Sequence, residues 1–92
     1  MNEEIKNVLV GRMVENLTVL RAKLGVTQAE LAEIAGISRQ TILAIEKKQR
    51  TMTWNTFLSL LFIFSVNKDT SALLNLFEIL TDELTGYITV KK

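Results

Sequence analysis

Apolar residues recur at helical spacing in the first quarter of the chain. They follow one another at intervals of three and four residues, which places them on one face of a helix: Val10, Met13, Leu17, Leu20 and Leu24. Gly25 comes directly after the last of them, and glycine readily adopts the left-handed conformation found past a helix end. The pattern therefore predicts a first helix that ends at about Leu24.

Two short helices are expected next, because a capping residue precedes each. Thr27 is followed by Glu30 three residues later, which is the capping-box pattern, and the helix behind it is predicted over Gln28–Ala35. Ser38 is a suitable cap for a third helix, which we expect to run from Arg39 to about Lys47.

The second half of the chain predicts two more helices. Thr53 marks the start of a fourth, over Trp54 to about Val66. A cap at Asp69 or Thr70 begins a fifth, which reaches about Leu84.

The remaining tail, Thr85–Lys92, contains the β-prone run Tyr87–Val90. A chain of 92 residues, of which 48% are apolar, makes one domain, 1–92. We therefore expect an all-α bundle of five helices with a short tail that favours a β-strand.

Composition removes several classes of function. The chain has no cysteine and no histidine, which excludes disulfides, the usual zinc ligand sets and a Ser-His-Asp triad. The longest apolar run, Phe57–Val66, is about half of the roughly 20 residues that a membrane helix needs, and Met1–Lys6 does not resemble a signal peptide. We expect a cytoplasmic protein with no cofactor, metal or membrane partner, and no enzymatic activity.

Charge is uneven along the chain, although the net charge is only +1. The segment from Leu20 to Arg50 contains six basic and three acidic residues, whereas the segments before and after it each have a slight excess of acidic residues. A basic middle third is a modest indication of a polyanionic partner.

The stretch most informative about function runs from Gln28 to Lys47. Its apolar positions fit two helices that cross at a steep angle through a tight turn, with Ala32 at the crossing and Gly36 in the turn. Ile42 and Ile45 would anchor the second of these helices on the core. Its opposite face then points to solvent, and its first turn presents amide groups that suit a phosphate.

These residues resemble a known family. The segment Leu20–Ala32 is similar to the start of the Cro and phage-repressor type helix-turn-helix domain, called the Xre family, and Gly36–Ile42 and Ile45–Lys47 continue the likeness. The resemblance covers about 10–66. It implies a five-helix, lambda-repressor-like domain that binds double-stranded DNA, usually as a dimer. We expect 67–92 to be a C-terminal helix and tail used for dimerisation.

The resemblance also implies roles for single residues. Arg39 and Gln40 match positions that read base edges, and their side chains suit guanine and adenine respectively. Gln28 matches a residue that bonds a phosphate and braces the recognition helix. Arg21 and Glu46 match a structural ion pair. The residues expected to contact DNA are Thr27, Gln28, Ser38, Arg39, Gln40, Thr41, Leu43, Ala44, Lys47, Lys48 and Arg50.

Within that set the expected contacts differ in kind. Thr41 would reach a phosphate, and Lys47, Lys48 and Arg50 would neutralise phosphates of the flanking strand without selecting sequence. Leu43 and Ala44 depart from the polar residues usual in the family. They would either touch a thymine methyl group or contribute nothing.

The fourth helix lacks a polar face, because seven of the eight residues in Phe57–Phe64 are apolar. An all-apolar helix must be covered, either by the fifth helix and tail or by a second copy of the chain, which we favour. The expected dimer interface contains Leu58, Phe62, Ile63, Leu74 and Phe77.

Two functions remain open. A twofold dimer would place two recognition helices about 34 Å apart on a near-palindromic operator, as in a transcriptional repressor. The alternative is an antitoxin-type module, which would grip a toxin partner with Gly86–Lys92 and the apolar surface of the fourth helix while regulating its own gene through DNA.

Overall fold

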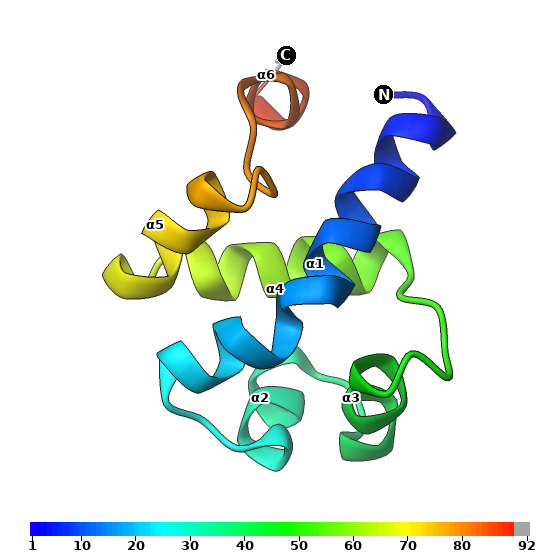
Figure 1. Ribbon diagram of the computed structural model, residues 1–92, viewed down its shortest axis with the longest axis vertical. Helices are drawn as coiled ribbons and strands as arrows, with labels where there is room; N and C mark the ends of the chain where they lie inside the picture. The colour runs from blue at the N-terminus through cyan, green and yellow to red at the C-terminus, as the bar shows by residue number, and fades with distance from the viewer. Residues whose placement is uncertain (90–92) are drawn as a thin grey trace.

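The computed structural model describes residues 1–89, and these form only α-helices and connecting turns (Figure 1). The elements are α1 (Glu3–Leu24), α2 (Gln28–Ala35), α3 (Arg39–Glu46), α4 (Trp54–Ser65), α5 (Lys68–Leu76) and α6 (Asp82–Thr89). The all-α class is confirmed, but over these residues the chain has six helices rather than five. No helix among residues 1–89 is long and apolar enough to cross a membrane.

The helix starts follow local capping chemistry. Thr27 accepts a hydrogen bond from the amide of Glu30, whose carboxylate accepts one from the amide of Thr27, so the predicted capping box is formed. Ser38 and Thr53 cap α3 and α4 as expected. The cap of α5 is a correction, because Asn67 fills that position in place of Asp69 or Thr70.

The predicted fifth helix is interrupted. It ends at Leu76, and the chain reverses at Glu78, which has a positive φ of 58°. The guanidinium of Arg12 donates a 2.8 Å hydrogen bond to the carbonyl of Glu78, which ties this turn to α1. Ile79 lies before the start of α6 and Leu84 lies just inside it, and both side chains are fully buried. The apolar pattern therefore continues through the break, so the break cannot be recognised from that pattern.

The predicted C-terminal strand is also corrected over the described residues. Tyr87, Ile88 and Thr89 belong to α6, and their side chains are exposed. No strand edge exists among residues 1–89 for this segment to pair with, whereas a helix satisfies its backbone groups internally. Val90 and the rest of the tail lie outside the described residues.

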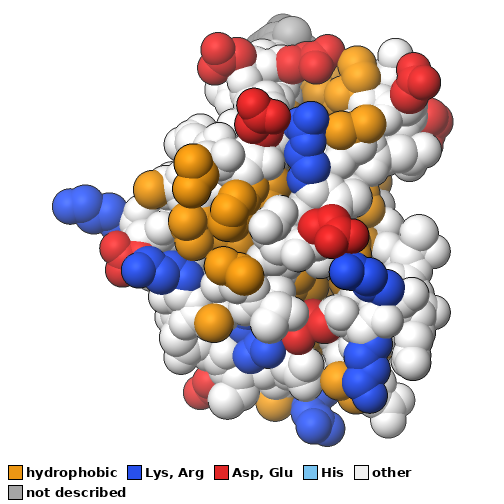
Figure 2. All heavy atoms as spheres, in the orientation of Figure 1, with side chains coloured by type: hydrophobic (Ala, Val, Ile, Leu, Met, Phe, Trp, Pro, Cys, Tyr) orange, Lys and Arg blue, Asp and Glu red, His pale blue; other side chains and the backbone are white. Residues whose placement is uncertain are grey.

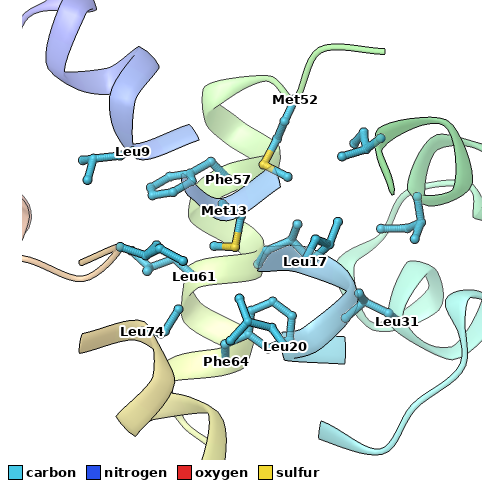
Figure 3. Close-up of a cluster of buried hydrophobic side chains, with 14 of the residues drawn as sticks. Leu9, Met13, Leu17, Leu20, Leu31, Met52, Phe57, Leu61, Phe64 and Leu74 are labelled. Carbon is cyan, nitrogen blue, oxygen red and sulfur yellow. The ribbon is translucent and has the colours of Figure 1, made fainter. Parts of the chain in front are cut away.

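The core lies where α1 crosses α4, as Figure 1 shows, and α5 packs on both helices. Met13, Leu17 and Leu20 of α1 meet Phe57 and Phe64 of α4 in a fully buried cluster (Figure 3). Val10 and Leu24, which were expected on the buried stripe, are only half-buried, and Leu9 is buried in their place. The pair α2 and α3 packs below this core, beside the end of α1.

Candidate nucleic-acid interface

The turn between α2 and α3 sets the angle between these two helices. Gly36 has a left-handed φ of 74°, and the amide of Ile37 donates a 3.0 Å hydrogen bond to the carbonyl of Ala32. A residue with a side chain would be strained at this φ. Ala32 is buried and α2 packs directly on α3, so a larger side chain at Ala32 would separate the helices.

Helix α3 has one buried and one exposed side. Ile42 and Ile45 are fully buried in the core, which turns Arg39 and Gln40 outward, and both are exposed. Ser38 accepts the amide hydrogen of Thr41 at 3.1 Å. The other amides of a first helical turn have no acceptor within the helix, so this end presents both N–H groups and two long polar side chains.

An ion pair joins the ends of α1 and α3. The Nε of Arg21 lies 2.7 Å from one carboxylate oxygen of Glu46, and its Nη2 lies 3.2 Å from the other. Arg21 also donates to the carbonyl of Val26 at 3.1 Å, and Gln28 donates to Glu46 at 3.0 Å. We call these three side chains, Arg21, Gln28 and Glu46, the part-buried ion network. It connects α1, α2 and α3 in one unit.

The network controls the charge of Glu46. Burial alone would raise the pKa of this carboxyl group, but hydrogen bonds from Arg21 and Gln28 and the charge of Arg21 outweigh burial and hold the pKa below its usual range. The hydrogen bond to Glu46 likewise raises the pKa of Arg21. Both groups are therefore charged at neutral pH.

Besides Gln28, which donates to Glu46, three of the residues expected at phosphates have partners within the chain: Thr41, Arg50 and Lys48. The hydroxyl of Thr41 lies 2.8 Å from that of Ser38 and accepts a 3.4 Å hydrogen bond from Arg50, which brings Arg50 to the first turn of α3. Lys48 has a left-handed φ of 61°, and its ammonium group lies 3.3 Å from the carboxylate of Glu15.

The other residues of the predicted set are distributed around the helix pair. Lys47 is exposed at the end of α3, and Thr27 is exposed at the start of α2 with its hydroxyl used as the cap. Leu43 and Ala44 are half-buried, so they offer only part of their surface. Figure 2 shows most basic side chains in the half of the molecule that holds α2 and α3, and several acidic ones gathered near α6 and the N-terminus.

The contact between Glu15 and Lys48 was not predicted from the sequence. Glu15 lies in the middle of α1 and Lys48 follows α3, so the two are 33 residues apart and meet only through tertiary packing. An acid half-way along a long helix carries no local signal for such a contact.

The expected dimer residues divide into two groups. Phe62 is 68% exposed on α4, and Leu58, Ile63 and Phe77 are half-buried. Leu74 is fully buried in the core of its own chain and has no surface to offer a partner, so we remove it from the expected interface. Beside Phe62 an apolar groove of about 440 Å³ separates α4 from α6. It is lined by Leu58, Leu61, Phe62, Ser65, Leu80, Thr85, Ile88 and Thr89.

A family model described as a helix-turn-helix domain matches residues 14–85, most of the chain. No curated protein and no solved structure matches the chain.

Proposed function

The chain belongs to the helix-turn-helix domain family, and we propose that it is a repressor of the Cro and phage-repressor type, which binds a specific sequence in double-stranded DNA. Membership of this family indicates DNA binding and a part in transcription regulation. Domains of this kind are typically non-enzymatic, and we propose no catalytic role.

The observation that carries the proposal is the exposure of Arg39 and Gln40 at the start of α3. Ile42 and Ile45 are fully buried, so the orientation of the helix is fixed and the two polar side chains project beyond it. An α-helix fits the major groove of B-DNA, where arginine forms paired hydrogen bonds with guanine and glutamine does so with adenine. The part-buried ion network joins α1, α2 and α3, which favours one relative position of α2 and α3 and so supports the proposal.

The remaining polar residues are proposed to hold the sugar–phosphate backbone. Thr27 caps α2 and Gln28 begins it, whereas Ser38 caps α3 and Thr41 lies in its first turn. Amides at helix starts attract phosphate. The basic residues after α3 would add affinity without sequence choice.

Selection of bound sites from random duplex DNA tests the proposal. We expect one enriched motif, and Gln40→Ala should lose preference at one base position while Gln49→Ala, an exposed glutamine outside the set, should not. A change from glutamine to alanine at a base contact should weaken recognition of that position by about 1–3 kcal/mol. Enrichment of no motif would contradict sequence-specific binding, and equal behaviour of the two variants would contradict base readout by Gln40.

We further propose that the protein acts as a homodimer on a near-palindromic operator. The groove between α4 and α6, with the exposed Phe62 in its wall, forms an apolar surface that a second copy would cover. Phe62→Ser should shift the molecular mass measured by light scattering from dimer towards monomer. Leu76→Ser is the matched control, since Leu76 is 72% exposed and lies outside the groove. A monomeric parent chain would refute the dimer.

The same groove supports the second candidate, an antitoxin-type module. Ile88 and Thr89 of α6 line one side of it, so deletion of Thr85–Lys92 would remove that wall. If a toxin partner binds there, purification from the native host should recover one stoichiometric protein with the full chain and none with the deleted chain. Recovery of the chain alone would argue against this function.

A further inference from the structure

An open cleft lies between α1 and the loop that follows α3. It has a volume of about 870 Å³, and α1 contributes Asn7, Val10, Gly11, Val14 and Glu15 to its wall. The loop contributes Lys48–Met52 on the other side. Two cations, Lys48 and Arg50, therefore line the cleft together with a single acid, Glu15.

The backbone conformation fixes the position from which the side chain of Lys48 extends. Its left-handed φ of 61° ends α3, and the amide of Gln49 then donates a 2.8 Å hydrogen bond back to the carbonyl of Ala44. From this position the ammonium group reaches across the cleft to Glu15, at 3.3 Å. The side chains are 57% and 67% exposed, and exposed pairs of this kind are weak, so another anion is able to displace the carboxylate.

We propose that Glu15 is an internal competitor of DNA phosphate for Lys48 and that it limits the affinity of the protein for DNA. This inference rests on the proposed DNA-binding function. A carboxylate and a phosphate both accept hydrogen bonds from an ammonium group, so Lys48 exchanges one for the other when a strand enters the cleft. Glu15 is then left beside the strand as a negative charge without its partner.

The exchange has two measurable consequences. Repulsion between Glu15 and the strand weakens binding. The freed carboxylate also attracts a cation from solution, which offsets part of the counterion release that accompanies phosphate binding and so flattens the salt dependence. Both effects are independent of base sequence, because Lys48 is placed at the backbone rather than at a base.

The test measures binding of the purified full chain to a random-sequence duplex by fluorescence anisotropy over a series of salt concentrations. Glu15→Gln keeps the size of the side chain and removes its charge. We expect roughly two- to fivefold tighter binding, the range set by an exposed ion pair, and a salt slope steeper by up to about 0.9.

The matched control is Glu4→Gln. It makes the same change of net charge on the same helix, at an exposed residue about 16 Å away along the axis. Screening limits the influence of a charge at that distance, so the gain in affinity should be smaller. Circular dichroism and the melting temperature establish that each variant is folded.

A third comparison identifies Lys48 as the route of the effect. In a Lys48→Ala background, the gain from Glu15→Gln should be smaller than in the parent chain, because only the direct repulsion between Glu15 and the strand is then removed. Equal affinity of the Glu15→Gln and Glu4→Gln variants would overturn the inference while DNA binding stands, and so would a gain from Glu15→Gln that is equally large without Lys48. If the parent chain binds no duplex at all, the proposed function falls and this inference falls with it.

Discussion

Replacing Arg21 with methionine should destabilise the protein by much more than an exposed ion pair would. The variant keeps most of the apolar stem but removes the guanidinium from Glu46, whose side chain is only 7% exposed. Loss of one partner costs about 3–5 kcal/mol for a fully buried pair, and an exposed pair contributes about 0–1 kcal/mol. Arg21 is 19% exposed and Gln28 still donates to Glu46, so we expect about 2–3 kcal/mol.

The stability lost in the Arg21→Met variant should depend on pH and should be smaller at low pH than at neutral pH. The pKa of Glu46 is lowered in the folded chain, so its stabilising effect is complete above the unfolded pKa and disappears as pH falls through the folded pKa. In the variant the hydrogen bonds and charge of Arg21 are absent, so the pKa of Glu46 is higher than in the parent chain. The difference between the two proteins should be largest near pH 7 and smaller at about pH 3, which lies below the ordinary pKa of a glutamate, because the stabilising effect is lost progressively as pH falls towards and through the lowered folded pKa of Glu46.

Urea unfolding at the two pH values measures this effect, and a fall in Tm of about 10–20 °C near neutral pH should accompany it. Lys48→Met is the matched control, since Lys48 pairs with the exposed Glu15 at 3.3 Å and its loss should cost less than about 1 kcal/mol. Adding Glu46→Leu to Arg21→Met should restore part of the stability by removing the unpaired charge. Equal midpoints for the parent and Arg21→Met, or a difference that does not change with pH, would refute the reasoning.

Three further outcomes are expected. Ile45→Ala should lower the free energy of unfolding by about 2–5 kcal/mol because it leaves a cavity under α3, whereas Ile34→Ala, at an exposed position of α2, should change it by less than about 0.5 kcal/mol in the same urea titration. Glu78→Gly should be about 1 kcal/mol more stable than Glu78→Ala, since φ is 58° there; equal melting temperatures would contradict this. Arg39→Ala should weaken binding to the selected operator by about 1–3 kcal/mol without changing Tm, which anisotropy and thermal melting check together.

Much of the local structure around α2 and α3 is predictable because its signals are local. Thr27 with Glu30 and Ser38 with Thr41 cap their helices through contacts three residues apart, and Gly36 supplies the left-handed residue of the turn. The exposure of the outer face of α3 follows from its buried isoleucines in the same way.

The break between α5 and α6 could not be read from the sequence. The turn has neither glycine nor proline, and its left-handed position is filled by Glu78, a residue that does not mark turns. Ile79 and Leu84 continue the apolar pattern across it. The geometry depends on tertiary contacts instead, among them the hydrogen bond from Arg12.

The difference between local signals and tertiary contacts also explains which parts of the interface could be predicted and which could not. Arg39 and Gln40 lie on one short helix, so their common exposure follows from periodicity. The contact between Glu15 and Lys48 joins a long helix to a distant loop, and no spacing rule connects them.

The central claim is that the first turn of α3 is the surface that reads DNA, and mapping by nuclear magnetic resonance tests it most directly. Titrating the isotope-labelled chain with its selected duplex should shift the backbone amides of Ser38–Thr41 most, together with those at the start of α2. The amides of α5 should change little. Shifts concentrated instead on α4 and α6, with the first turn of α3 unaffected, would contradict the account.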